Sequence, residues 1–267
     1  LLNTLDFNLT NAQSSCIKEI NNDLASSEPM LRLLQGDVGS GKTIVAVFTL
    51  IQAVENNFQA AIMAPTEILA RQHLQNFTHY LKPLNIQIAF LSGSQNAQER
   101  ENQLDLIENG EAKVVIGTHA LFQESVNFKN LALVIIDEQH KFGVHQRLSL
   151  SKKADKTPHQ LVMTATPIPR SLTMSAYADL DTSVIDELPP GRQAVETVAL
   201  SNARRDELIN KIRKISNEGR QIYWVCTLIE ESEALRAESA EKTFNYLKDN
   251  LNDFNEFFSE ITFHNPL

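Results

Sequence analysis

The chain has 267 residues, of which 42% are hydrophobic, and a formal net charge of −9 at pH 7. That length suffices for one large domain or two smaller ones, and the negative charge disfavours non-specific attraction to nucleic acid without excluding contacts through backbone N–H groups. No apolar run has membrane-spanning length, and the two cysteines, Cys16 and Cys226, lie far apart. We therefore expect a cytoplasmic protein with reduced thiols and no membrane contact.

The first predicted element is a helix that begins near Thr10 and runs to about Leu24. Thr10 and Gln13 have the spacing of a capping box, in which Thr10 is the N-cap. The side-chain amide of Gln13 offers both a donor and an acceptor, so it is also suited to reading adenine. Spacing alone favours the structural role for Gln13.

A glycine-rich loop follows, between a predicted strand over residues 30–34 and a predicted helix over 44–54. Residues 36–43, Gly-Asp-Val-Gly-Ser-Gly-Lys-Thr, fit the phosphate-binding pattern G-x-x-x-x-G-K-[ST] in its strand–loop–helix context. Glycine permits positive φ, so successive N–H groups can approach a polyphosphate, while Lys42 reaches the β and γ phosphates and the Thr43 hydroxyl binds Mg²⁺. The nucleotide-binding residues are expected to be Gly36, Gly39, Ser40, Gly41, Lys42 and Thr43.

Further apolar runs alternate with helical patterns along the chain. Predicted helices cover residues 68–81 and 94–108. Predicted strands cover residues 60–64, 86–91, 114–116, 131–136 and 160–163. Such alternation is typical of an α/β fold with a parallel sheet covered on both faces. Polar signatures follow several strands, and the carboxyl edge of an open α/β sheet is where ligands bind.

Two adjacent carboxylates, Asp137 and Glu138, follow the predicted strand over residues 131–136. Carboxylates at a buried strand end are costly to ionise unless they meet a cation, and Mg²⁺ held by Thr43 would be that cation. We expect Asp137 to orient the metal and Glu138 to polarise the attacking water. His140 adjoins this site and is expected either to be structural or to relay the state of the nucleotide.

A second unit is predicted after a stiff linker, residues 188–193, which contains adjacent prolines and a glycine. Residues 194–200 and 221–226 have strand patterns, and a helical pattern lies between them. We therefore predict a P-loop domain over residues 1–187 and the incomplete start of a second α/β domain over 194–267.

Several blocks of sequence together resemble the motifs of superfamily 2 helicases, and more closely those of the RecG family of bacterial DNA helicases. The blocks follow the family's order between about Phe7 and about Glu241, at residues 34–43, 64–70, 117–122, 135–140, 163–170 and 223–232. The resemblance implies a RecA-like P-loop NTPase fold, and ATP-dependent remodelling of branched or forked DNA in DNA repair and recombination. It also implies a nucleoid-associated bacterial protein whose motor is monomeric.

The resemblance also implies roles for residues that match the family's motifs. Gln13 would read adenine, and Phe7 would stack on the base. Thr66, and Thr118 with His119, would contact the DNA backbone. The residues expected to couple hydrolysis to motion are His140, Thr164 and Thr166.

The chain departs from the family pattern, and we expect it to be a fragment of a longer helicase. A wedge domain is expected before the motor, and the arginine-bearing motifs of the second motor domain are expected after it. An arginine finger contributes about 10³–10⁵ in rate. We therefore expect this chain to bind nucleotide and to hydrolyse it weakly or not at all by itself.

Alternative functions remain open at this stage. A transcription-coupled repair translocase would share much of the phosphate-binding motif, although His140 argues for the RecG family. A small-molecule P-loop kinase would leave residues 164–166 unexplained. A non-catalytic nucleotide switch would not need the carboxylate of Glu138.

Overall fold

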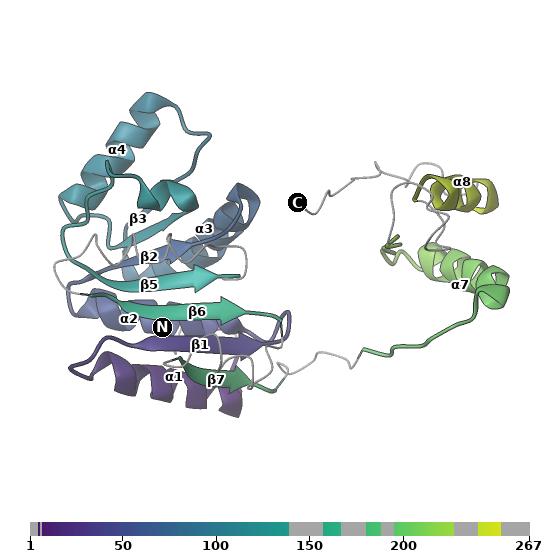
Figure 1. The fold of residues 1–267 in the computed structure, drawn as a ribbon, viewed down its shortest axis with the longest axis horizontal. Coiled ribbons are helices and arrows are strands. Elements are labelled where there is room, and N and C mark those ends of the chain that lie inside the picture. Colours follow the sequence, from purple (N-terminus) through teal and green to yellow (C-terminus); the bar gives the residue numbers. More distant parts are fainter. Residues whose placement is uncertain are drawn as a thin grey trace. The chain divides into compact units, whose positions relative to one another are not determined.

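The computed structural model describes residues 5, 7–138, 157–166, 180–187, 195–226 and 240–251. The chain consists of two compact units, residues 1–193 and residues 194–267 (Figure 1). The assignment of these parts to helicase domains, over 1–187 and 194–267, stays a prediction.

The first unit is built on a seven-stranded sheet in the order β3-β4-β2-β5-β6-β1-β7, and all its strand pairs are parallel. Figure 1 shows this directly, because the arrows of β5, β6, β1 and β7 point the same way. The strands are β1 (Leu31–Gly36), β2 (Gln59–Met63), β3 (Ile88–Leu91), β4 (Val114–Gly117), β5 (Leu131–Asp137), β6 (His159–Thr164) and β7 (Asp181–Ile185). The predicted α/β class with a parallel sheet is confirmed.

Helices cover both faces of this sheet. The helices are α1 (Asn11–Leu24), α2 (Lys42–Glu55), α3 (Glu67–Leu81) and α4 (Ala97–Glu108), with short 3-10 turns at η2 (Lys82–Leu84) and η3 (His119–Phe122). The apolar residues of α1, α2 and α3 share one buried cluster, while α4 and η3 contribute to a second cluster. The helices predicted over 68–81 and 94–108 are confirmed to within three residues.

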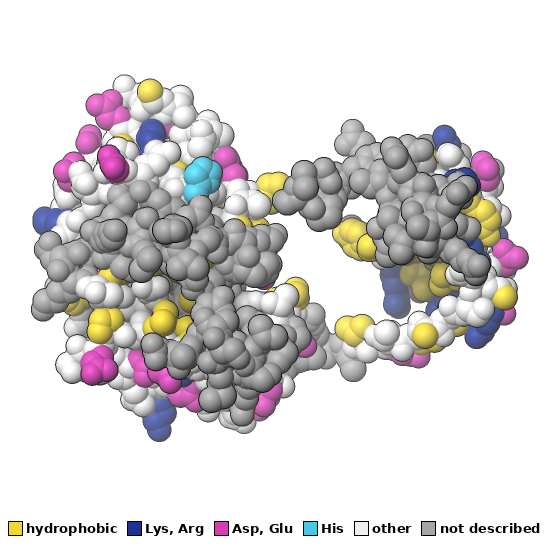
Figure 2. Space-filling view, viewed as in Figure 1, with side chains coloured by type: hydrophobic (Ala, Val, Ile, Leu, Met, Phe, Trp, Pro, Cys, Tyr) yellow, Lys and Arg dark blue, Asp and Glu magenta, His cyan; other side chains and the backbone are white. Residues whose placement is uncertain are grey.

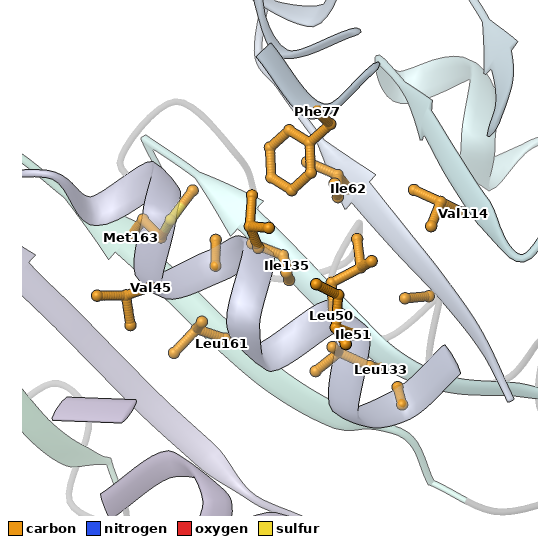
Figure 3. Packing of buried hydrophobic residues seen from close by; sticks show 14 of the residues in the cluster. Val45, Leu50, Ile51, Ile62, Phe77, Val114, Leu133, Ile135, Leu161 and Met163 are labelled. Atoms are coloured by element: carbon orange, nitrogen blue, oxygen red, sulfur yellow. The ribbon is translucent and has the colours of Figure 1, made fainter. Parts of the chain in front are cut away.

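The two clusters lie on opposite faces because side chains alternate along each strand. On β2, Ile62 belongs to the first cluster and Met63 to the second. Figure 3 shows the first cluster, in which Phe77 of α3 lies over Ile62 and the α2 side chains lie beside those of β5 and β6. The near-continuous apolar strands predicted from the sequence are therefore buried on both sides.

Strand β7 was not predicted from the sequence. It begins Asp-Thr-Ser, and only Ser183 and Ile185 are buried, so it carries no apolar run. It forms the edge of the sheet beside β1, where Arg32 donates hydrogen bonds to Asp23 and to the Ser183 hydroxyl, at 2.6 and 2.9 Å. Polar pairing with Arg32 stabilises this edge strand.

The second unit is described over residues 195–226 and 240–251. It contains η5 (Asn202–Arg204), α7 (Arg205–Asn217) and α8 (Ala240–Asn250), whose shared core is Ile209, Ile212, Leu247 and Leu251. The strands predicted over 194–200 and 221–226 are wrong where the structure describes them, because those residues are irregular. A strand needs a neighbour for its N–H and C=O groups, and none pairs with them in the described part of this unit.

No helix of the described residues is both long enough and apolar enough to cross a membrane. The two cysteines are free thiols, and Cys16 is buried.

Candidate nucleotide site

The phosphate-binding loop lies at the carboxyl end of β1, between β1 and the start of α2. Its glycines adopt the conformations that the pattern requires, because Gly39 and Gly41 have φ of 77° and 91°. The packing leaves no room for larger residues. A Cβ at Gly36 would lie 2.5 Å from the Ser40 hydroxyl, and one at Gly41 would lie 2.2 Å from Nε2 of Gln13.

Lys42, the first residue of α2, folds back over this loop. Its Nζ donates hydrogen bonds to the carbonyl oxygens of Gly36 and Asp37, at 2.7 and 3.0 Å. Burial lowers the pKa of the Lys42 ammonium below its usual range, and the charges of Asp137, Glu138 and Asp37 oppose that shift. Lys42 therefore lies within the electrostatic reach of both predicted site carboxylates.

Gln13 joins the start of α1 to the loop. Its Oε1 accepts a hydrogen bond from the backbone N–H of Thr10 at 3.0 Å, and its backbone N–H donates to the Thr10 hydroxyl at 3.2 Å. The predicted capping box is thus confirmed. The Gln13 amide nitrogen also donates to the carbonyl oxygen of Ser40 at 2.8 Å. This last contact spans 27 residues and carries no signal in the sequence.

Asp137 ends β5 and Glu138 follows it, at the same edge of the sheet. Glu138 has φ of 52°, an uncommon backbone conformation for a non-glycine residue, and its N–H donates to the carbonyl oxygen of Met163 at 3.0 Å. One oxygen of Asp137, Oδ2, lies 2.8 Å from Nε2 of His73 on α3. The sequence did not single out His73, because a histidine on an amphipathic helix gives no indication of its partner.

Thr164 and Thr166 lie near Asp137 and Glu138 and near the loop, because β6 is paired with both β5 and β1. Thr164 is paired with Gln35 of β1, just before the loop. The Thr164 and Thr166 hydroxyls are 2.8 Å apart, and the N–H of Thr166 donates to the Thr164 hydroxyl at 3.2 Å. The sheet thus brings together the loop, the carboxylates and these threonines, whereas His140 lies outside the described residues.

The residues predicted to contact DNA follow β2 and β4 at the same sheet edge. Thr66 is the exposed N-cap of α3, and its hydroxyl accepts from the N–H of Leu69 at 3.3 Å. Thr118 is buried and caps η3, while His119 beside it is exposed. Among the described side chains visible in Figure 2, acidic and basic groups are interspersed without a continuous basic patch.

The remaining predicted nucleotide contacts are less enclosed. Phe7 is 45% exposed, just before α1, and Thr43 is half-buried in the first turn of α2. Both side chains are therefore accessible to solvent.

The residues present fit a magnesium nucleotide. The Ser40 hydroxyl is buried and has no hydrogen-bond partner among the described residues, and Gly39 and Gly41 have the positive φ that lets backbone N–H groups turn toward a polyphosphate. The described residues contain no group of three or more His, Cys, Asp or Glu side chains that could hold a metal ion. Mg²⁺ is usually bound by one or two carboxylates plus substrate phosphates.

Comparison with known proteins assigns the chain to a family. The family model described as DEAD/DEAH box helicase matches residues 10–175. The chain belongs to the DEAD/DEAH box helicase family. Within it, the chain is 55% identical over 252 residues to the ATP-dependent DNA helicase RecG of Escherichia coli O157:H7. It is also 49% identical over 246 residues to the protein of that name from Thermotoga maritima (strain ATCC 43589 / DSM 3109 / JCM 10099 / NBRC 100826 / MSB8).

These alignments cover 93% and 92% of this DEAD/DEAH box helicase chain but only 36% and 31% of the two relatives. The chain therefore spans about a third of the length of the curated relatives that it matches. The resemblance to the RecG family drawn from the sequence motifs is confirmed.

Solved structures support the same conclusion for the helicase fold. A structure of RecG bound to a three-way DNA junction is 42% identical and superposes with a TM-score of 0.79, covering 93% of this chain and 32% of that one. The DEAD-box helicase Mss116 bound to single-stranded RNA and UDP-BeF shares the fold at 18% identity, with a TM-score of 0.59 over 82% of this chain and 50% of its own. The predicted RecA-like fold is confirmed.

Proposed function

We propose that this chain is the nucleotide-binding motor part of an ATP-dependent DNA helicase that remodels branched DNA. One observation carries the proposal. The loop over 36–43, the carboxylates Asp137 and Glu138, and the threonines Thr164 and Thr166 meet at one edge of the sheet. The likeness to RecG supports double-stranded, branched DNA as the substrate, since one solved RecG is bound to a three-way DNA junction.

The reaction is hydrolysis of the β–γ bond of ATP. Backbone N–H groups of the loop hold the phosphates, and Lys42 exchanges its two carbonyl partners for the β and γ phosphates. Thr43 and Asp137 would hold Mg²⁺, which would neutralise charge on the phosphates. Glu138 accepts a hydrogen bond from the attacking water and orients it toward the γ phosphate.

The remaining site residues serve recognition and coupling. Phe7 stacks on the adenine, and Gln13 reads its edge after exchanging one of its present hydrogen bonds. The DNA backbone is contacted by Thr66, Thr118 and His119. Nucleotide state is relayed to motion by His140, Thr164 and Thr166. We assign residues 1–187 to the first RecA-like domain and 194–267 to the start of the second, in a monomeric motor of the bacterial cytoplasm.

The alternatives explain less of the site. A transcription-coupled repair translocase would use the same loop, but the relatives described above are RecG proteins. A non-catalytic switch would bind nucleotide without needing a carboxylate at the position of Glu138.

The test separates binding from chemistry in the 267-residue chain. Lys42→Ala is expected to weaken MgATP binding by about 10–100-fold, because it removes a charged hydrogen-bond donor. Glu138→Gln should retain binding and lower the single-turnover hydrolysis rate by about 10²–10⁴-fold, because the base is lost. Binding is measured with a fluorescent ATP analogue, and hydrolysis with excess protein over radiolabelled ATP and a three-way DNA junction.

Matched controls are Lys18→Ala and Glu108→Gln, which change exposed side chains on α1 and α4. Both should behave as the unmodified chain does. Unchanged hydrolysis in Glu138→Gln, with hydrolysis detectable in the unmodified chain, would show that the catalytic assignment is wrong.

A further inference from the structure

Asp137, the predicted magnesium ligand, is hydrogen-bonded to a histidine that the proposed mechanism does not use. The Nε2 atom of His73 lies 2.8 Å from Asp137 Oδ2, and the two side chains are 9% and 15% exposed. A metal ligand carboxylate is ionised and only accepts hydrogen bonds, so if Asp137 binds a metal, His73 donates to it from Nε2. The contact joins residues that are 64 positions apart in the chain.

The fold holds the imidazole ring of His73 in place. Helix α3 follows β2 after three residues, and β2 is paired with β5 up to Met63 and Ile136, next to Asp137. The ring also packs edge-on against Phe77, one turn further along α3, with ring centroids 6.0 Å apart. Since Phe77 is fully buried, this contact holds the ring of His73 against the core.

The opposite ring nitrogen argues against a purely structural histidine. His73 Nδ1 is buried and has no hydrogen-bond partner among the described residues. Burial of an unpaired acceptor lowers stability, so an apolar side chain of similar size would suit this core position better. The single hydrogen bond to Asp137 is what distinguishes histidine from such a side chain here.

We propose that His73 is a positioning residue of the nucleotide site, which holds the carboxylate of Asp137 in place for the magnesium ion that this carboxylate would bind. The inference rests on the proposed role of Asp137 as a metal ligand. Carboxylates that bind metals are usually themselves hydrogen-bonded, and removal of such a partner lowers metal affinity or activity by about 10–100-fold. The hydrogen bond also joins the metal carboxylate to α3, the helix whose N-cap is Thr66.

Metal affinity provides a test that does not depend on turnover. The probe is Mn²⁺, whose binding to the 267-residue chain in the presence of ADP is followed by electron paramagnetic resonance. His73→Leu is expected to weaken Mn²⁺ binding by about 10-fold or more, because Asp137 loses its donor. His73→Gln, whose amide nitrogen can take the place of Nε2, should restore most of that affinity. His79→Leu, an exposed position on the same helix, should leave it unchanged.

The controls distinguish failure of this inference from failure of the proposed function. ADP binding measured without metal should be equal in the unmodified chain and in His73→Leu. If Asp137→Asn weakens Mn²⁺ binding while His73→Leu does not, the metal site stands and the role of His73 is wrong. If neither variant weakens it, the metal assignment of Asp137 itself is wrong.

A spectroscopic measurement on the unmodified chain covers the case in which His73→Leu does not fold. Nitrogen-15 NMR of the histidine rings, assigned with His73→Gln, should show that Nε2 of His73 carries a proton. The signal should shift when Mg²⁺ and ADP are added together, and not when ADP is added alone. A proton on Nδ1 in place of Nε2, or no metal-dependent shift, would overturn the proposal.

Discussion

Similar strand patterns occur in both units of the chain, but they form paired strands only in the first unit. In the first unit, the apolar runs predicted as strands are paired in one parallel sheet. In the second unit, residues 195–200 and 221–226 are irregular, and Val195 and Val225 are 82% and 87% exposed. The comparison teaches that an alternating pattern becomes a strand only where a neighbouring strand takes up its backbone hydrogen bonds.

The first unit also has the larger described core. The first unit buries apolar residues on both faces of its sheet (Figure 3). The described core of the second unit is a contact between α7 and α8. A small core supplies little free energy of unfolding. We therefore expect the two units to unfold separately, with the first unit the more stable.

The largest expected effect is on the core of the first unit. Phe77→Ala should lower its free energy of unfolding by about 3–5 kcal/mol, because a fully buried ring is removed. Far-UV circular dichroism in urea follows this transition. Fluorescence follows the second unit, since the only tryptophan of the chain is Trp224.

Ile209→Ala is the matched change in the second unit, where Ile209 is 4% exposed. It should lower the midpoint of the fluorescence transition and leave the transition of the first unit unchanged. If Ile209→Ala moved both transitions equally, the units would not unfold independently.

A smaller effect is expected on the pH dependence of stability, in the first unit only. Burial lowers the pKa of His159 below its ordinary value of 6.5, and its Nδ1 accepts a hydrogen bond from the N–H of Met30 at 3.0 Å. Because His159 binds a proton more tightly in the unfolded chain, protonation of His159 destabilises the folded state. The contribution of the neutral His159 ring to stability is complete above about pH 6.5 and is lost as pH falls below it. The loss is at most about 1.4 kcal/mol per pH unit.

His159→Gln should therefore give a first unit whose urea midpoint changes less between pH 7 and pH 5.5 than that of the unmodified chain. The Trp224 fluorescence transition should not respond to the substitution. An equal pH dependence of the first transition in both proteins would show that His159 does not titrate in this way.

The smallest effect is expected on the irregular segments. Val225→Thr should change the stability of the second unit by no more than about 0.5 kcal/mol, because the side chain is exposed. Val115→Thr, in buried β4, should cost the first unit about 1–3 kcal/mol, because a hydroxyl is taken from water. Comparable losses from both changes would mean that residues 221–226 are packed in solution.

The sequence by itself determined the features whose chemistry is local. The loop over 36–43 needs glycine, lysine and threonine within eight consecutive positions, so its pattern predicted both its conformation and its place before a helix. The capping box of Thr10 and Gln13 is equally local, as is the placement of Asp137 and Glu138 after an apolar strand. These predictions succeeded because each depends only on residues that are close together in the sequence.

Only the tertiary structure decided what depends on the order of the strands. Arg32 of β1 is hydrogen-bonded to Ser183 of the polar strand β7. Gln13 is hydrogen-bonded to Ser40, and His73 to Asp137. Residues that are separated by tens of positions meet because β2, β5, β6 and β1 lie side by side in the sheet. The same dependence explains the irregular segments of the second unit, whose local pattern was adequate but whose hydrogen-bonding neighbours the described chain does not contain.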